Sequence, residues 1–266
     1  MLKTFSKFAK LHPRWQLAIR TIPFVIVILA FKSVTHYYGY EILTPTSLFT
    51  AIISANIFLI SFLLSGVLSD YKESEKIPGD LATSLENLAD EGFIIYNNKK
   101  TIESKEYLEH ILGMHKDILD WFYEKKKASY VMKEIFKFND FFYKFESQTQ
   151  PNFIVKLKQE QTNLRRIITR AHTIRRTSFL GSGYAIAEII TFILSIAMII
   201  LKIEPFYESI FFVSFVSFIL IYMVFFIKDL DNPFSYVEEG LTEEIPLQPI
   251  VNSQKRIQKM YDSLVK

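Results

Sequence analysis

Apolar residues are concentrated in four long runs, two near each end of the chain, with a charge-rich stretch between the pairs. The runs cover about 21–38, 47–69, 179–201 and 209–227, and the second contains no charged residue. A helix of roughly twenty residues crosses the hydrocarbon core of a bilayer. Short linkers join the members of each pair, and Pro45 interrupts the first linker. We therefore predict four transmembrane helices arranged as two hairpins.

The charge-rich middle of the chain shows the spacing of water-soluble helices. Its apolar residues recur every three or four positions, as in Leu81, Leu85 and Leu88 and again in Leu108, Ile111 and Leu112. Strand signals are weak. The predicted fold class is an all-α integral membrane protein with a helical cytoplasmic domain.

This pattern divides the chain into five predicted segments. They are an N-terminal cytoplasmic segment 1–20, a first hairpin 21–69, a helical domain 70–178, a second hairpin 179–227 and a cytoplasmic tail 228–266. The tail contains Pro246 and Pro249, so we expect it to be extended apart from a short helix near 253–264.

Basic residues set the expected orientation, because cytoplasmic loops carry an excess of Lys and Arg. The segment before the first span contains five basic residues and no acid, and the segment before the third contains five arginines: Lys3, Lys7, Lys10, Arg14 and Arg20, then Arg165, Arg166, Arg170, Arg175 and Arg176. The hairpin turns carry only Lys32 and Lys202. Both termini are thus predicted to face the cytoplasm of a multi-pass plasma (inner) membrane protein. A cleaved signal peptide is disfavoured, since the first run continues into Lys32 without a small-residue cleavage site.

Composition excludes several classes of chemistry. The chain has no cysteine, which excludes disulfides and thiolate chemistry, and its net charge of +3 is too small to indicate nucleic-acid binding. Glycine-rich phosphate loops, Gly-x-Ser-x-Gly and His-Glu-x-x-His motifs are absent. We predict neither an enzyme, nor a cofactor, nor a metal site.

Two further groups of ionisable residues are assigned no chemistry. His110 and His115 are five positions apart, which does not place them on one helix face, and we interpret them as surface histidines. The acidic residues Asp229, Asp231, Glu238 and Glu239 lack the glycine and terminal glutamate of a calcium loop. We interpret them as solvated.

Glu188 lies inside the third span, and an intramembrane carboxylate is a candidate for permeation or coupling. The alternative is that it reaches the interface or pairs with a neighbouring arginine. The five arginines between 165 and 176 have two possible roles. They attract anions or anionic lipid headgroups, or they only set the orientation of the chain in the membrane.

The second span carries a regular stripe. Ser54, Phe58 and Phe62 are spaced four apart and therefore lie on one helix face. Several copies of this helix around an axis would form stacked rings, and a hydrophobic constriction of this kind can gate by dewetting. Packing or lipid contact is the alternative role for the stripe.

Two stretches resemble the bestrophin family of anion channels. The first runs from Phe58–Phe62 through Asp70–Leu81 and resembles the pore-lining helix and its cytoplasmic continuation. The second resembles the segment that closes the family's last membrane helix and the apolar stretch after it, and it comprises Asp229, Asp231, Asn232, Pro233 and Phe234 followed by Ile245–Ile250. The order of the four spans and the helical body agree with the family.

The resemblance implies a homopentamer around a central pore, with the hydrophobic neck at Ser54, Phe58 and Phe62. Three departures stand out. Ser54 replaces an apolar residue, Ser235 stands where the family usually has glycine, and the acidic run that binds calcium in animal members is missing.

The leading functional hypothesis is a channel permeable to chloride or another small inorganic anion, embedded in a lipid bilayer. Two alternatives remain. The first is a non-conducting membrane scaffold of the same architecture. The second is a proton-coupled carrier that uses Glu188.

Overall fold

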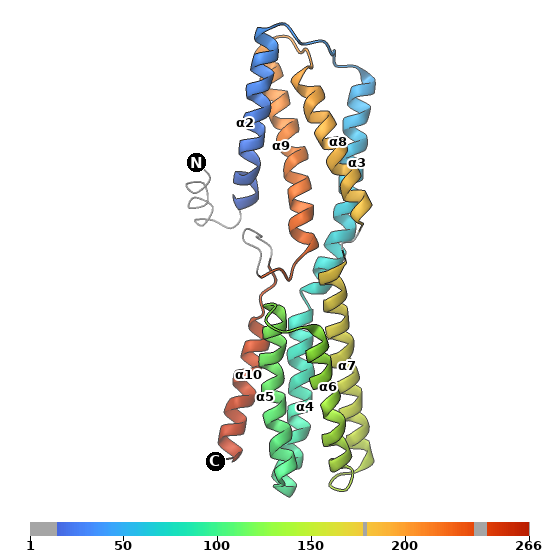
Figure 1. Ribbon diagram of the computed structural model, residues 1–266, viewed down its shortest axis with the longest axis vertical. Helices are drawn as coiled ribbons and strands as arrows, with labels where there is room; N and C mark the ends of the chain where they lie inside the picture. The colour runs from blue at the N-terminus through green and yellow to red at the C-terminus, as the bar shows by residue number, and fades with distance from the viewer. Residues whose placement is uncertain (1–14, 178–179, 237–243, 266) are drawn as a thin grey trace. The chain divides into compact units, whose positions relative to one another are not determined.

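The computed structural model describes residues 15–177, 180–236 and 244–265, and most of them are α-helical (Figure 1). The helices are α2 (Gln16–Tyr37), α3 (Ser47–Ser74), α4 (Ile77–Lys99), α5 (Ile102–Phe122), α6 (Ala128–Phe145), α7 (Pro151–Arg176), α8 (Gly181–Ile199), α9 (Phe206–Asp231) and α10 (Gln248–Val265). No strand occurs in these ranges, which confirms the all-α fold class. The basic residues before Arg20, together with Phe179, Glu238 and Glu239, lie outside the described residues.

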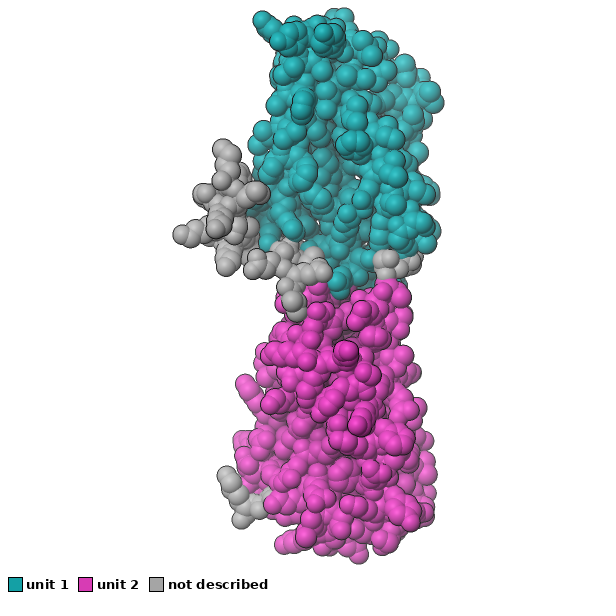
Figure 2. Space-filling view, viewed as in Figure 1, with its two compact units in different colours: residues 1–71, 178–232, 240–243 teal, residues 72–177, 233–239, 244–266 magenta. Residues whose placement is uncertain are grey.

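The chain divides into two compact units, coloured separately in Figure 2. The first, the membrane unit, contains α2, most of α3, α8 and α9. The second, the helical unit, contains α4 to α7 and α10. Four helical segments are long and apolar enough to cross a membrane, and they fall in α2, α3, α8 and α9. The protein is thus an integral membrane protein.

Three of the membrane unit's helices pack closely, α2 on α8 and α9, and α8 on α9. Its core gathers aliphatic side chains from α3, α8 and α9, including Ile60, Leu63 and Leu194. Gly183 of α8 lies against Leu63, where a Cβ atom would come within 2.8 Å of the leucine side chain. Large apolar side chains also cover the outer faces of α2, α8 and α9, as expected for helices in contact with lipid.

The turns that join α2 to α3 and α8 to α9 lie side by side. An isolated parallel bridge connects Leu43 and Leu201, and the Lys202 amide donates to the Leu43 carbonyl at 2.6 Å. Lys32 does not lie in the hairpin turn, contrary to the prediction from the sequence. It belongs to α2, is fully buried, and donates to the Glu41 carboxylate and the Leu201 carbonyl. One buried cation therefore ties both turns together.

The helical unit is an up-and-down bundle of α4, α5, α6 and α7 with α10 packed on α4 and α5. Thr101 caps α5 by accepting a hydrogen bond from the Ser104 amide, and Pro151 occupies the first turn of α7, where its missing N–H costs least. The centre is aromatic. The Tyr107 ring makes edge contacts with Phe138 and Phe145, and its hydroxyl donates to the Leu88 carbonyl at 3.1 Å.

The tail contains more helix than the sequence predicted. α10 begins at Gln248 rather than near 253, because its apolar residues follow a helical period that Pro249 in the first turn does not interrupt. Ile250, Ser253 and Ile257 are buried against the bundle. The Tyr261 hydroxyl donates to the Glu109 carboxylate at 2.5 Å, which fixes the outer end of α10.

Candidate pore-lining stripe and neighbouring polar groups

The stripe on α3 faces away from the core of the membrane unit. Ser54 is exposed, and the side chains of Phe58 and Phe62 are 75% and 58% exposed. The opposite face of the same helix carries Leu63 and Val67, which are almost completely buried. The Ser54 hydroxyl donates to the Thr50 carbonyl at 3.0 Å, so its proton is used within the helix.

The buried face of α3 is fixed in rotation by a polar contact. The Asn56 amide donates to the Thr191 hydroxyl of α8 at 3.0 Å, and Asn56 is almost fully buried. A hydrogen bond between helices in an apolar surrounding is costly to break. Together with Leu63 against Gly183, it holds the side of α3 opposite the stripe against α8.

Glu188 pairs with a lysine rather than with an arginine. Its carboxylate lies 2.9 Å from the Lys228 ammonium of α9, and both side chains are about half exposed. One turn along α8, the Tyr184 hydroxyl donates to the Asp231 carboxylate at 2.8 Å. The ion pair and the hydrogen bond both join α8 to α9. Lys228 was not among the predicted site residues, although it directly follows the last predicted span, 209–227, and this position marks it as a group at the interface.

The residues of the second motif have different surroundings. Asp229 is buried in the last turn of α9, so its interpretation as a solvated residue was wrong. Asp231 accepts from Tyr184, and the side-chain oxygen of Asn232 is buried without a hydrogen bond among the described residues. In the helical unit, the Pro233 carbonyl accepts from the Ile245 amide at 3.2 Å, and the buried Phe234 ring lies 5.2 Å from the Phe122 ring.

The arginines before the third span are partly used inside the helical unit. Arg170 binds the Glu73 carboxylate through two nitrogens, at 2.8 and 2.5 Å, and this hydrogen bonding holds the pKa of Glu73 below its ordinary value. Arg175 donates to the Trp121 carbonyl at 2.9 Å and to Glu124 at 2.6 Å. Arg166 donates to the Asn163 side chain, and Arg165 and Arg176 are exposed.

The two histidines are not on the surface. His115 is completely buried, its Nδ1 lies 2.9 Å from the Ile111 carbonyl and its Nε2 lies 3.1 Å from the Ser253 hydroxyl. Mostly buried His110 approaches the Glu134 carbonyl at 3.0 Å. Burial lowers the pKa of both rings, so a neutral ring is favoured. The surface interpretation was wrong because the helices that cover them come from distant parts of the sequence.

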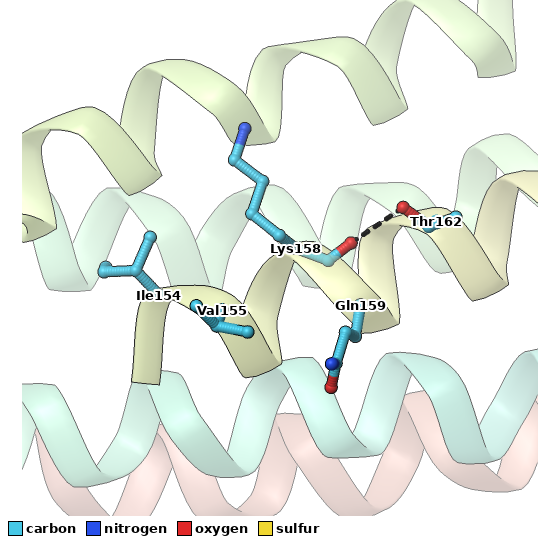
Figure 3. Close-up of a pocket in the computed structure, with 5 residues that line it drawn as sticks. All are labelled: Ile154, Val155, Lys158, Gln159 and Thr162. Carbon is cyan, nitrogen blue, oxygen red and sulfur yellow. Dashed lines mark hydrogen bonds between the residues drawn. The ribbon is translucent and has the colours of Figure 1, made fainter. Parts of the chain in front are cut away.

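No chemical site competes with the stripe among the described residues. The side chains in the described ranges include no cluster of three histidine or acidic groups able to hold a metal. A shallow groove on α7 is lined by Ile154, Val155, Lys158, Gln159 and Thr162 (Figure 3). The Lys158 ammonium points away from Gln159 and donates to Asn139, while the Thr162 hydroxyl donates to the Lys158 carbonyl at 2.9 Å. We assign this groove no ligand.

The fold is matched by several solved structures. Two variants of a bacterial bestrophin homologue from Klebsiella pneumoniae give TM-scores of 0.74 and 0.72, at 9% and 11% identity. The first match covers 92% of this chain and 97% of that chain, and the second covers 94% and 100%. The chain has a bestrophin-like fold. A third structure of that homologue, phased with zinc, gives a TM-score of 0.69 at 10% identity, covering 92% and 97%.

No family model and no curated protein matches the sequence. The likeness to the Klebsiella pneumoniae homologue is thus one of fold, at 9% to 11% sequence identity. Within this fold, α3 is the helix that carries the stripe of Ser54, Phe58 and Phe62.

Proposed function

We propose that the protein is an anion-permeable channel in which α3 lines the pore and Ser54, Phe58 and Phe62 form its neck. One observation carries the proposal. The stripe is exposed on α3, while the opposite face of that helix is buried against α8. The bestrophin-like fold agrees with the family resemblance of the sequence, and that resemblance implies a homopentamer around a central pore.

Phenylalanine rings suit this role physically. Rings stacked around a narrow axis expel water and so close the pore without any plug. The ring edge carries the positive part of the quadrupole, so edges directed at the axis tolerate an anion better than a cation. Chloride is the expected ion. Arg165 and Arg176, which are exposed, would raise the local anion concentration.

The ion pair of Glu188 with Lys228 gives this carboxylate a role that needs no transport. The Glu188 carboxylate lies 2.9 Å from the Lys228 ammonium on the neighbouring helix α9. We assign the pair a structural role in joining α8 to α9. The proposed setting is the plasma (inner) membrane, with both termini in the cytoplasm.

The test is anion efflux from liposomes that contain the purified oligomer, measured for wild type, Phe58→Ala and Phe62→Ala. Removing one ring from each subunit widens the constriction. We expect flux to rise by roughly tenfold, which corresponds to about 1.4 kcal/mol removed from the barrier. Reversal potentials in a chloride gradient should favour anions over cations.

Phe192→Ala is the matched control, because Phe192 of α8 is exposed to a similar degree (67%) but lies outside the stripe. It should conduct like the wild type. Equal flux in wild type and both α3 variants would remove the neck assignment. An intact oligomer without any flux would favour the scaffold, and flux that collapses in Glu188→Gln would favour the carrier.

A further inference from the structure

The turn between α5 and α6 is the most basic short segment of the helical unit. It contains Lys125, Lys126 and Lys127 in succession, and Lys133 follows in the second turn of α6. These lysines line an open hollow together with Ser129 and Tyr130. We call Lys125–Lys127, Ser129, Tyr130 and Lys133 the lysine hollow.

Packing within the helical unit places this hollow beside chain segments that lead directly into apolar helices. The Phe122 ring, at the end of α5, lies 5.2 Å from the Phe234 ring, and the Tyr123 ring lies 5.4 Å from the Tyr236 ring. Arg175 of α7 donates to the Trp121 carbonyl and to Glu124 in the turn itself.

Short stretches of chain connect the residues in these contacts to two apolar helices, α9 and α8. Phe234 follows the end of apolar α9 at Asp231 by three residues, which span at most about 10 Å. Arg175 precedes the start of apolar α8 at Gly181 by six residues, which span at most about 20 Å. These short connections limit how far the end of the helical unit that holds the hollow can lie from the ends of the two apolar helices.

Internal ion pairs neutralise only part of the positive charge. Lys126 lies 2.5 Å from Asp117, and its ammonium also lies 4.4 Å above the Tyr130 ring. The Lys125 side chain is 69% exposed, and its ammonium lies 3.9 Å from the Asp120 carboxylate. An exposed pair at this long distance contributes little. Lys127 and Lys133 are exposed, and neither forms an ion pair in the described part of the chain.

Aromatic residues accompany the charge. The rings of Tyr123 and Tyr130 are 44% and 41% exposed on either side of the three lysines. Tyrosine is enriched at membrane interfaces, because its ring is apolar and its hydroxyl is polar. Lysine clusters next to a membrane attract anionic lipids, with a contribution of about 1 kcal/mol for each basic residue near the surface.

We propose that the lysine hollow binds the phosphate headgroups of anionic lipids in the adjacent leaflet. Lys125, Lys127 and Lys133 supply the charge, while Lys126 is held by Asp117 and shapes the hollow. The site differs from the arginines before α8, of which Arg170 and Arg175 are already bound to Glu73 and Glu124. It does not depend on conduction through the proposed pore.

The test compares two triple variants that remove the same charge. Lys125→Gln/Lys127→Gln/Lys133→Gln alters the hollow, and Lys99→Gln/Lys105→Gln/Lys144→Gln alters exposed lysines at the other end of the bundle. Binding of phosphatidylglycerol and phosphatidylcholine to the purified protein is counted by native mass spectrometry. We expect affinity for phosphatidylglycerol to fall at least tenfold in the first variant only, with phosphatidylcholine binding unchanged in both.

Equal loss in both variants, or no loss in the first, would overturn the proposal. So would competition by millimolar inorganic phosphate that removes the lipid completely, since the hollow would then be a site for a free anion. Oligomer mass and helicity verify that each variant folds.

A second measurement leaves the lysines in place. Because the chain has no cysteine, a fluorophore can be attached at Ser129→Cys in the hollow or at Ser147→Cys in the α6–α7 turn. A quencher on the lipid headgroup should quench the first label in anionic bilayers and leave the second bright. Equal brightness of the two labels would count against the proposal.

Discussion

Lys32 shows how one residue can control two turns. Its ammonium is fully buried and donates to Glu41 in the α2–α3 turn and to the Leu201 carbonyl in the α8–α9 turn. His36 also approaches the Glu41 carboxylate, at 2.9 Å. Burial raises the pKa of Glu41, but hydrogen bonds from Lys32 and His36 outweigh it and hold that pKa below its ordinary value.

Replacing this lysine should be costly. Lys32→Met removes the buried donor of the Leu201 carbonyl and leaves the Glu41 carboxylate with His36 as its remaining partner. The loss of one member of a buried pair costs about 3–5 kcal/mol. Thermal unfolding of the purified protein in detergent measures the effect. Lys202→Gln, which removes only an exposed pair with Glu204, should melt like the wild type. A similar melting temperature for both variants would contradict the assigned role of Lys32.

His115 gives the helical unit a defined response to acid. Burial lowers its pKa below 6.5, so the unfolded chain binds a proton at a higher pH than the folded chain does. The unfolding free energy therefore decreases as the pH falls below 6.5, and the decrease stops once the pH is below the folded-state pKa. The slope is at most about 1.4 kcal/mol per pH unit for each histidine.

Far-UV circular dichroism melts between pH 7.5 and 5.5 test this response. His115→Gln should make the decrease of stability with acid shallower, and His110→Gln/His115→Gln should make it shallower still, because burial also lowers the pKa of His110. An identical slope in wild type and the double variant would show that other groups cause the acid sensitivity.

At the scale of elements, helix packing depends on where glycine permits close approach. Gly92 lies in the middle of α4, and a Cβ there would come within 2.7 Å of the Tyr107 ring and 2.9 Å of Leu108, both on α5. Gly113 lies inside α5, and a Cβ there would meet nothing within 4 Å. Both glycines are helical, but only Gly92 is needed for the close packing of α4 on α5.

Alanine at these positions should have opposite effects. Gly92→Ala forces α4 from α5 and should destabilise by about 1–3 kcal/mol, as overpacking of a core does. Gly113→Ala only improves helix propensity and should stabilise by up to about 1 kcal/mol. The measurement is the thermal midpoint of each variant. Stabilisation by both would show that α4 and α5 are not in close contact at Gly92.

For the whole molecule, the distribution of basic residues predicts which parts face the same side. From the positive-inside rule we expect the helical unit to lie in the cytoplasm and the α2–α3 turn to lie on the other side of the membrane. Tyr40 is exposed in that turn, and Ser147 is exposed in the α6–α7 turn of the helical unit.

Cysteine labelling tests this orientation in a chain that has no native cysteine. An impermeant maleimide should label Tyr40→Cys in intact cells and Ser147→Cys only after the membrane is opened. Labelling of both cysteines from outside would reject the orientation, and the reverse pattern would invert it.

Several features were predictable because they depend on neighbours in sequence. Apolar runs identify the membrane helices, since each span satisfies its own backbone hydrogen bonds and has only to be long and apolar. Spacing of four residues places Ser54, Phe58 and Phe62 on one face, since the helical period is local. Three helices extend beyond their runs, because helix propensity does not end where the bilayer does. α2 begins at Gln16, α3 ends at Ser74 and α9 ends at Asp231.

By itself the sequence determined the all-α class, the membrane spans and a candidate stripe, all of which follow from local periodicity and hydropathy. Only the tertiary structure decided the partners of charged and polar groups. It pairs Lys32 with a carbonyl 169 positions away, His115 with Ser253 138 positions away, and Glu188 with Lys228 rather than with an arginine. The physical reason is that burial and charge pairing depend on which helices become neighbours, and no local pattern records that choice.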